Sequence, residues 1–491
     1  MSLMKVRITA ALLSISVLLC LVVSCAGADN GTTDSLTATL ADENFDELKT
    51  ADKEQSRQNY KDSLPQNLDF KGKEITVSVL DHDYYRVDWM AESETGDIVN
   101  DALFRRNLTV SDRLNIDLNV ISLYNTEAAG ANACVASILA GDNAFDIMNV
   151  TAACFMNIVT QNVLSDLHKV PYIDLSKPWW NKTSLEVASF YGKSYVITGE
   201  IAFRYISGIA VVVFNKALED AYGLDIYQDY FNGEWTLERL HQYSADAYSD
   251  LDGDSVRNNG DRFGFASDTI ACADAYYMPL GIQITEIKNG IPVLTLNNER
   301  SSSALTDLHR FYWENQGTLI LKDGVQTDGH YTLFKNGQAL FNGAQLGNLY
   351  TTLRETDVEF GIVSYPKYYE NQDVYHSHNR NGYSLYAVPV TCGDVDAAGA
   401  VLEAAAAENY RIVMPIYFDT SLKIKYSRDN ETAQVLDIIL AGVKCDFSFF
   451  TDIMYFNRSV LGASTFNFAS LYASQESKYN AIISNAMKSF E

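Results

Sequence analysis

The sequence predicts an α/β protein built from two lobes. Three observations lead to this prediction. The chain has 491 residues, more than one compact core usually holds. A strand–helix–strand–helix–strand pattern occupies residues 74–150, and a second strand–helix unit opens near Ser194. Apolar residues make up 47% of the chain, so most of it must fold rather than stay disordered.

The first lobe is expected to start with a strand at residues 74–80, where Ile75, Val77 and Val79 alternate with polar residues. A helix follows, with apolar residues from Val99 to Leu114 on one side. The later pattern predicts a strand at 116–120, a helix at 133–139 and a buried strand at 145–150. Such a succession indicates a parallel sheet with crossover helices.

The second lobe is expected to open with a strand, because residues 206–214 are almost continuously apolar. A short helix is predicted at 216–222, and Thr236 is the expected N-cap of a helix at 237–249. Further helices are predicted at 302–313, 395–408, 431–441 and 476–490, with strands at 359–364 and 383–390. Some of these late segments are expected to return to the first lobe.

The charge balance excludes two classes of partner. The chain has 37 Lys and Arg against 63 Asp and Glu, a net charge of −26. Nucleic acid binding needs clustered cations, and docking on anionic lipid needs a basic face. We therefore expect no nucleic-acid partner and no electrostatic attachment to a membrane.

The N-terminus predicts export. Lys5 and Arg7 precede an apolar run from Ile8 to Val23, too short for a typical spanning helix. The sequence Val-Val-Ser-Cys at 22–25 resembles the bacterial lipobox, so residues 1–24 are expected to be a signal peptide and Cys25 the lipidated first residue. Cleavage would remove two cations and make the net charge two units more negative. The expected location is extracytoplasmic, lipid-anchored to the bacterial cell membrane, although an uncleaved anchor is the alternative.

Residues 25–72 are polar and contain few large apolar side chains, so we expect a disordered tether there. Beyond Cys25 the chain has five cysteines, which are widely spaced and include no CxxC pair. This spacing indicates neither a zinc site nor a disulfide framework. They are Cys134, Cys154, Cys272, Cys392 and Cys445, most of them expected to be small buried residues, with one disulfide left possible.

A set of short motifs appears in a fixed order along the chain. They are AGDNAFD at 140–146, PWWN at 178–181, GKSY at 192–195, VFNK at 213–216, GEWTL at 233–237, FKNGQAL at 334–340 and FGIVSYP at 360–366. Behind a lipobox, this order resembles family 1 of the extracellular solute-binding proteins of bacterial ABC importers, which includes maltose-type receptors. The resemblance covers roughly residues 73–490.

The resemblance implies a two-lobed periplasmic-binding-protein-like fold of type II. Each lobe would be a mixed sheet flanked by helices, with a hinge between them. Lobe 1 would hold 73–200 and 340–392, and lobe 2 would hold 201–339 and 393–491. The implied activity is capture of a small solute, most simply a sugar or oligosaccharide, in the interlobe cleft. A monomeric receptor of this family delivers its solute to an ABC permease and changes no bond.

Candidate ligand-binding residues follow from what sugars need, which is flat aromatic faces and fixed polar groups. They are chosen after strands and at the expected crossings between lobes, and they are Tyr84, Tyr85, Trp89, Asp146, Asn149, Trp179, Trp180, Glu200, Tyr205, Trp235, Asn342, Gln345, His376 and His378. For Trp179, Trp180 and Trp235 core packing is the alternative. The two histidines lack a matching ligand set for a metal, so a polar loop near the cleft is expected there.

The strongest local motif lies at residues 250–261 and predicts a structural Ca²⁺ site. Oxygen ligands recur at the spacing of an EF-hand loop. They would come from Asp250, Asp252, Asp254, the carbonyl of Val256, Asn258 and Asp261. The loop departs from that pattern at Ser255, where a glycine is usual, and in ending on Asp rather than Glu, which resembles the dockerin-type loop. A solvated polar turn is the alternative.

Two other functions remain open. The first is an exported glycoside hydrolase that uses two carboxylates, although the chain contains no nucleophile elbow and no HExxH motif. The second is a surface glycan-binding or sensor protein with the same fold and no transport role. The sequence does not identify the solute, and peptides remain possible.

Overall fold

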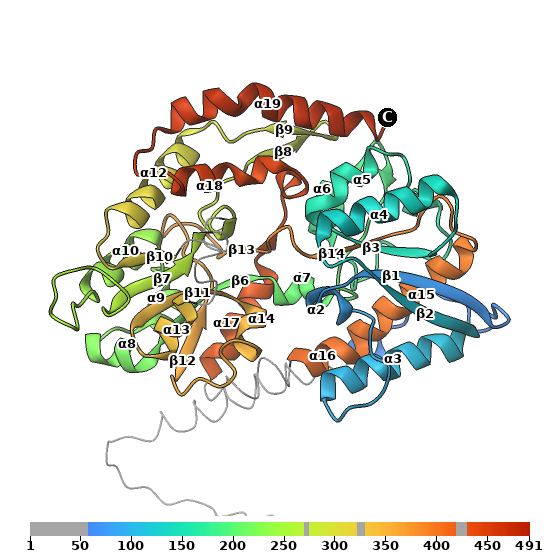
Figure 1. Ribbon diagram of the computed structural model, residues 1–491, viewed down its shortest axis with the longest axis horizontal. Coiled ribbons are helices and arrows are strands. Elements are labelled where there is room, and N and C mark those ends of the chain that lie inside the picture. Colours follow the sequence, from blue (N-terminus) through green and yellow to red (C-terminus); the bar gives the residue numbers. More distant parts are fainter. Residues whose placement is uncertain (1–56, 270–273, 322–328, 419–429) are drawn as a thin grey trace, which may run out of the picture. The chain divides into compact units, whose positions relative to one another are not determined.

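The computed structural model describes residues 57–269, 274–321, 329–418 and 430–491. Residues 56–491 belong to one compact unit (Figure 1). The predicted signal peptide, Cys25 and residues 25–56 of the predicted tether lie outside the described residues, as does Cys272. In the described part, no helix combines the length and the apolar character needed to cross a membrane.

The first sheet has four strands in the order β14–β3–β1–β2. These strands are β1 (Lys73–Leu80), β2 (Ile116–Leu123), β3 (Ile147–Thr151) and β14 (Ser384–Ala387). β1 runs parallel to β2 and β3, whereas β14 runs antiparallel to β3, so the sheet is mixed. Ile75, Val77 and Val79 are at most 1% exposed, and they form the core of the first lobe.

Helices cover this first sheet, and polar caps fix where several of them start. Asp97 caps α3 by accepting from the backbone N–H groups of Val99 and Asn100, and Thr126 caps α4 in the same way. The elements are α2 (Asp83–Arg86), α3 (Ile98–Leu114), α4 (Glu127–Ala140), η1 (Ala152–Cys154), α5 (Phe155–Val159), η2 (Leu167–Lys169), α6 (Lys182–Ala188), β4 (Ser189–Phe190), β5 (Lys193–Ser194), α15 (Val395–Glu408), η3 (Asn409–Val413) and α16 (Met414–Tyr417).

The second sheet has five strands in the order β10–β7–β11–β6–β12. They are β6 (Ala210–Asn215), β7 (Phe263–Asp268), β10 (Thr318–Leu321), β11 (Ala339–Gln345) and β12 (Phe360–Val363). β7 is parallel to β10 and β11, and β6 is antiparallel to β11 and β12. Every residue of β6 and β11 is buried, as expected of central strands covered on both faces.

The remaining elements of the second half surround this sheet or extend from it. They are α8 (Lys216–Tyr222), α9 (Ile226–Asn232), α10 (Leu237–Asp246), β8 (Thr285–Lys288), β9 (Ile291–Leu294), α12 (Glu299–Trp313), α13 (Gly329–Lys335), α14 (Leu346–Tyr350), α17 (Asn430–Ala441), β15 (Val443–Lys444), η5 (Phe447–Phe450), η6 (Asp452–Tyr455), α18 (Phe456–Leu461) and α19 (Phe468–Lys488). Thr236 caps α10 as expected, by accepting from the N–H of Arg239.

The lobe assignment differs from the expectation in two places. β11 and β12 pair with β6, so residues 340–363 belong to the second lobe rather than the first. Helix α15 packs against α3, so residues 395–408 belong to the first lobe rather than the second. β11 is buried along its whole length and α15 from Ala397 to Ala407, and a sequence pattern that indicates burial does not specify which sheet or helix covers them.

Several element boundaries also differ. The apolar run expected as one strand at 206–214 divides into a helix, α7 (Phe203–Ser207), and strand β6, with a turn at Gly208 and an isolated bridge at Ile209. Helix α4 starts at Glu127 rather than at residue 133, because Thr126 caps it. Helix α19 starts earlier than the expected residue 476, because Asn467 caps it by accepting from the N–H of Ser470.

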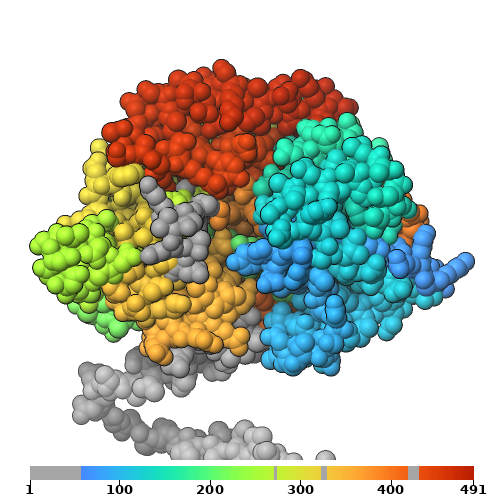
Figure 2. Space-filling model, viewed as in Figure 1, coloured from blue at the N-terminus to red at the C-terminus, as the bar shows by residue number. Residues whose placement is uncertain are grey.

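The chain connects the lobes several times. Residues 152–209 lead from β3 to β6, and residues 364–383 lead from β12 back to β14 through the short strand β13 (Ser377–His378). Helix α19 contacts α12 and β9 of the second half. Phe490, just beyond it, packs against Phe155 and Phe190 of the first. In Figure 2 the red C-terminal segment accordingly borders both the yellow and the teal segments.

A buried aspartate joins two of these connections to the first lobe. Asp88 accepts a hydrogen bond of 2.7 Å from the backbone N–H of Phe203, at the start of α7. It also accepts from the hydroxyls of Ser384 at 2.6 Å and Tyr386 at 2.7 Å, both in β14. Burial raises the pKa of Asp88 to about 6, and the donors limit that rise.

Arg106 of α3 extends this buried network. Its guanidinium donates to the backbone oxygen of Asp88 at 2.7 Å and to the Asn409 side chain at 3.1 Å. Asn409 in turn donates to the backbone oxygen of Glu200 at 2.8 Å. One polar network therefore holds residues 200–203 of the first connection, and β14, where the second connection ends, against α3.

Residues 57–72, which precede the first sheet, pack against the first lobe. Leu64 is buried, and Leu68 and Phe70 pack against the same core. The expectation of a disordered tether is therefore wrong for residues 57–72, because these apolar side chains bury enough surface to offset the entropy of ordering the segment.

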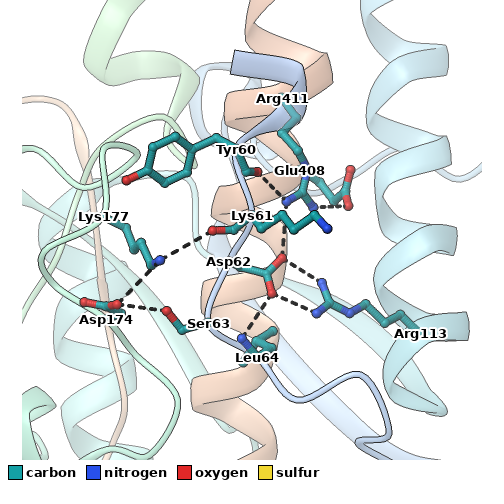
Figure 3. A network of polar contacts seen from close by, with 10 residues as sticks. All are labelled: Tyr60, Lys61, Asp62, Ser63, Leu64, Arg113, Asp174, Lys177, Glu408 and Arg411. Atoms are coloured by element: carbon teal, nitrogen blue, oxygen red, sulfur yellow. Dashed lines mark hydrogen bonds and ion pairs between the residues drawn. The ribbon is translucent and has the colours of Figure 1, made fainter. Parts of the chain in front are cut away.

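Asp62 attaches this segment to two helical elements of the first lobe (Figure 3). Its carboxylate accepts two hydrogen bonds of 2.8 Å from Arg113 of α3 and one of 3.2 Å from Arg411 of η3. The Asp62 side chain is 5% exposed. Burial by itself raises the pKa of this carboxyl, but the two arginines outweigh that effect and lower it from 3.8 to about 2.

Replacing Asp62→Asn should destabilise the fold, because two arginines then lose their shared counter-charge. We expect the free energy of unfolding to fall by about 1–3 kcal/mol near neutral pH, measured by thermal and urea unfolding. A carboxylate whose pKa is lower in the folded than in the unfolded protein stabilises the fold at pH values above the unfolded-state pKa. That contribution disappears as the pH falls through the folded-state pKa. The difference between wild type and variant should therefore shrink from pH 3.8 toward about pH 2.

The control is Glu94→Gln, which removes the acid of the exposed Arg105–Glu94 pair. Exposed ion pairs contribute about 0–1 kcal/mol, so this variant should unfold almost as the wild type does. Equal effects of the two substitutions, or a difference independent of pH, would contradict the role given to Asp62.

Candidate functional site

A cavity of about 380 Å³ lies where the carboxyl ends of strands from both sheets come together. Its first wall follows β1 and β2 and consists of Leu80, His82, Tyr84, Tyr85 and residues 125–127. Its other walls are Arg204 of α7, Gln345 at the end of β11, residues 379–382, Tyr455 and Arg458. In open α/β sheets the region beyond the carboxyl ends of the strands is the usual place for a ligand.

The first wall is held by hydrogen bonds at the starts of two helices. His82 caps α2 by accepting from the N–H of Tyr84 at 3.2 Å. Tyr84 is exposed, whereas Tyr85 is buried and donates from its hydroxyl to Glu127 at 2.5 Å and to the Gly382 carbonyl at 3.1 Å. Burial, and then the Glu127 carboxylate, raise the pKa of Tyr85, so its hydroxyl stays protonated.

Arg204 joins the two lobes at the second wall. Its guanidinium donates to the Gln345 side-chain oxygen at 2.9 Å and lies 4.2 Å from the centre of the Tyr84 ring. A single cation thus connects α7, the end of β11 and α2. The planar guanidinium and the exposed tyrosine ring offer a solute both hydrogen-bond donors and a flat apolar face.

The third wall contains two more arginines and two asparagines. Arg458 of α18 pairs with the buried Asp274 at 2.7 Å, and the Arg380 Nε lies 3.6 Å from the same carboxylate. Asn381 donates to the Tyr455 hydroxyl at 2.9 Å. Asn379 donates to the backbone oxygen of Tyr205, which fixes this loop against α7.

Three of the residues expected to bind ligand line this cavity: Tyr84, Tyr85 and Gln345. The histidine-containing loop was expected near the cleft, and its residues 379–382 do line the cavity. The histidines themselves do not. His378 is fully buried with its ring 4.4 Å from that of Phe449, and burial lowers its pKa to about 3.

The four tryptophans proposed as ligand contacts are all buried, at most 3% exposed, and lie outside this cavity. Trp89 packs beside Tyr386, and Trp180 donates from its indole N–H to Glu403 at 3.1 Å. Trp179 has its ring 6.0 Å from that of Tyr60, and Trp235 donates to the Ser364 carbonyl at 2.9 Å. We therefore assign these side chains packing roles, which their large apolar surfaces favour.

Four of the other proposed contacts also have partners inside the protein. Asp146 accepts from the N–H of Thr76 at 3.0 Å, and Glu200 pairs with Arg57. Tyr205 packs edge-on against Tyr383, and the Asn342 Oδ1 accepts a hydrogen bond of 2.9 Å from the His330 Nδ1. Asn149 is buried in β3, and His376 lies in the loop before β13; neither lines the cavity.

Sequence reasoning missed the arginines. Arg204, Arg380 and Arg458 come from three segments far apart in the chain, and each stands alone among other residue types. Glu127 and Asn125 follow β2 directly, so the rule that ligands bind at the carboxyl ends of strands could have found them.

The cysteines behave as small interior residues. Cys134, Cys154, Cys392 and Cys445 are free of disulfide bonds in the described part of the chain. Burial raises the pKa of each of these thiols, which makes them poor nucleophiles.

The loop at 250–261 has several features that calcium binding needs. Carboxylate oxygens of Asp250, Asp252 and Asp254 lie within 4.8 Å of one another. Ser255 adopts a φ of +60°, the left-handed conformation that glycine usually provides at this position. Two backbone hydrogen bonds between Ser249 and Arg262, of 3.1 and 2.9 Å, close the base of the loop.

Asp261, at the last ligand position, is fully buried, and its Oδ1 has no hydrogen-bond partner in the described part of the chain. It stands outside the group of three clustered carboxylates. No helix follows the loop, since β7 begins at Phe263. The loop therefore offers the oxygen ligands that Ca²⁺ prefers, and three of its carboxylates are already close together. It lacks the second helix that a calcium-sensor EF-hand has.

Two other cavities among the described residues are lined by one lobe only. One of about 520 Å³ lies beside Trp89 along β2, and another of about 430 Å³ lies near Leu164 and Tyr195. The residues that line each of these come from the first lobe. The cavity at Arg204 differs from them, because residues of both lobes line it.

No protein-family model matches the chain, and no curated protein sequence matches it. Solved structures do match its fold. A cyclic α-maltosyl-1,6-maltose-binding protein from Arthrobacter globiformis is 14% identical, with a TM-score of 0.58 over 84% of this chain and 100% of that chain. The ABC substrate-binding protein Lmo0181 from Listeria monocytogenes, solved with cycloalternan, is 16% identical, with a TM-score of 0.52 over 84% and 99%.

UgpB from Mycobacterium tuberculosis, solved with glycerophosphocholine, is 14% identical, with a TM-score of 0.55 over 79% of this chain and 95% of that chain. Structural matches at such low sequence identity establish only the fold. The expected architecture, an α/β protein with the two-lobed periplasmic-binding-protein-like fold, is confirmed.

Proposed function

We propose that this protein is a solute-binding protein that captures a saccharide and delivers it to an ABC importer. The observation that carries this proposal is the cavity between the strand ends of the two lobes, lined by an exposed tyrosine and by amide and guanidinium donors. Closure of two lobes over a solute changes the surface that a permease contacts, and binding alone can drive such a change.

Two further facts support capture rather than catalysis. Solved structures of the same fold include proteins that bind maltotetraose and lacto-N-biose, both saccharides. Among the described residues that line the cavity, Glu127 is the one carboxylate, and the Tyr85 hydroxyl already binds it. Glycoside hydrolysis by the usual route needs two carboxyl groups across the scissile bond.

Tyr84 offers the clearest test of the proposed saccharide site. Stacking of a sugar on this exposed ring should be lost in Tyr84→Ala, and we expect roughly ten-fold weaker binding in calorimetric titration with a saccharide found by thermal-shift screening. The matched control is Tyr191→Ala, since Tyr191 is also exposed but lies in the β4–β5 turn outside the cavity.

Product analysis after prolonged incubation should recover the saccharide unchanged. Conversion of the saccharide at a useful rate would support the hydrolase alternative and contradict the proposal. Binding that is unaffected by Tyr84→Ala would place the site elsewhere. Uptake of labelled saccharide by cells with and without the protein separates a transport receptor from a surface sensor, because only the receptor increases uptake.

We also propose that Cys25 anchors the mature protein to the cell membrane outside the cytoplasm. The lipobox sequence at 22–25 supports this proposal. Cells fed an alkyne-labelled fatty acid should label the wild-type protein and not Cys25→Ala, and the variant should leave the membrane fraction. Equal labelling of the two proteins would exclude lipidation at this residue.

We further propose that the loop at 250–261 binds a structural Ca²⁺ ion through Asp250, Asp252, Asp254, Val256, Asn258 and Asp261. The clustered carboxylates and the buried Asp261 support this proposal. The ion would neutralise acids that otherwise repel one another and would stiffen the loop between α10 and β7.

Millimolar Ca²⁺ should raise the melting temperature of chelator-treated protein, because an ion that binds only the folded state stabilises it by mass action. Asp252→Ala should remove this shift, whereas Asp246→Ala, just before the loop, should keep it. No shift in the wild type would remove the calcium proposal and leave the solute proposal untouched.

A further inference from the structure

The cavity has the opposite charge balance to the protein around it. The chain as a whole carries a net charge of −26. Three arginines line the cavity, Arg204, Arg380 and Arg458, against one carboxylate, Glu127. A concave site lined by one sign of charge concentrates solutes of the other sign.

Internal partners leave part of this positive charge unbalanced. Asp274 is fully buried and serves two of the arginines, since Arg458 binds it at 2.7 Å and Arg380 lies 3.6 Å from it. Arg204 contacts two neutral groups, the Gln345 amide and the Tyr84 ring. Among the described residues at this cavity, therefore, two carboxylates, Glu127 and Asp274, face three guanidinium groups.

Arg380 is only partly neutralised by Asp274. Its Nε is buried, lies 3.6 Å from that carboxylate and makes no hydrogen bond in the described part of the chain. The side chain is 25% exposed, so its guanidinium retains the capacity to bind an anionic group in the cavity. The planar guanidinium matches the paired oxygens of a carboxylate, sulfate or phosphate group.

We infer that the solute of this site is an anionic saccharide, one that carries a carboxylate, sulfate or phosphate group bound between Arg204 and Arg380. This inference rests on the proposed function and narrows its substrate class. The acidic group would lie against the guanidinium groups of Arg204 and Arg380, and the sugar ring would lie against Tyr84. Since Arg204 already bridges α7 and β11, an anion on it would draw both lobes onto the solute.

Matched ligands isolate the contribution of the charge. Calorimetric titration compares digalacturonate with its methyl ester, a 6-sulfated disaccharide with the unsulfated sugar, and a sugar phosphate with the parent sugar. The acidic member of at least one pair should bind roughly ten-fold tighter or more. Its affinity should fall as salt rises from 50 to 500 mM, because screening weakens charge attraction and leaves neutral hydrogen bonds.

Variants identify the residues responsible. Arg204→Gln should weaken binding of the acidic sugar at least several-fold more than binding of the neutral sugar, because glutamine keeps a neutral donor and loses only the charge. Arg380→Gln should do the same. Arg105→Gln is the control, since Arg105 is exposed on α3 and pairs with Glu94 away from the cavity. Melting curves accompany both variants, because Arg380 neighbours Asp274 and Arg204 donates to Gln345. Retained binding of the neutral sugar shows that the site remains folded in each variant.

The outcomes separate the two levels of the proposal. Tight binding of neutral saccharides, with no gain from an acidic group and no effect of salt, overturns the anionic substrate and leaves the saccharide receptor intact. If none of the saccharides binds, charged or neutral, the proposed function fails and the inference falls with it. A preference for the acidic member that survives both arginine substitutions also overturns the assignment to these residues.

Discussion

The buried carboxylate of Asp88 is the interaction on which the arrangement of the two lobes depends. It receives the backbone N–H of Phe203, where the first connection enters α7, and two hydroxyls of β14, where the second connection ends. Arg106 extends the same network to Asn409. A half-satisfied buried carboxylate is costly, so these segments are strongly constrained to remain together.

The cavity is a consequence of this constraint. Its walls come from the ends of β1 and β2, from α7 and from the loop at 379–382, and the last two lie beside the segments that Asp88 fixes. Arg204 and Asn379 then attach these walls to Gln345 and Tyr205. The protein thus holds a polar site at the junction of its lobes without placing that site on either sheet alone, and such an arrangement suits a solute that both lobes must contact.

The protein as a whole is acidic, whereas its cavity is lined mainly by cations. Excess carboxylates favour solubility and repel other anionic surfaces. Inside the cavity, buried Asp274 holds two arginines in position without neutralising both. Positive charge is therefore retained where a solute would enter, and the surrounding acids do not abolish it because a buried or partly buried charge is screened less than an exposed one.

The sequence by itself determined the local elements. Alternation predicted β1 and β2, Thr236 predicted the start of α10, and the order of motifs pointed to the correct fold. It also pointed to Tyr84 and Tyr85, because residues after a strand lie at its carboxyl end. Gln345 was proposed as lying at a crossing between the lobes, and it lines the cavity from the end of β11. Tertiary structure alone decided that β11 belongs to the second sheet, that α15 belongs to the first lobe, and that the tryptophans are core. It also decided that Arg204, Arg380 and Arg458 meet. Periodicity reports only whether a side chain is buried, whereas the partner that buries it, or the cation that faces it, comes from residues hundreds of positions away.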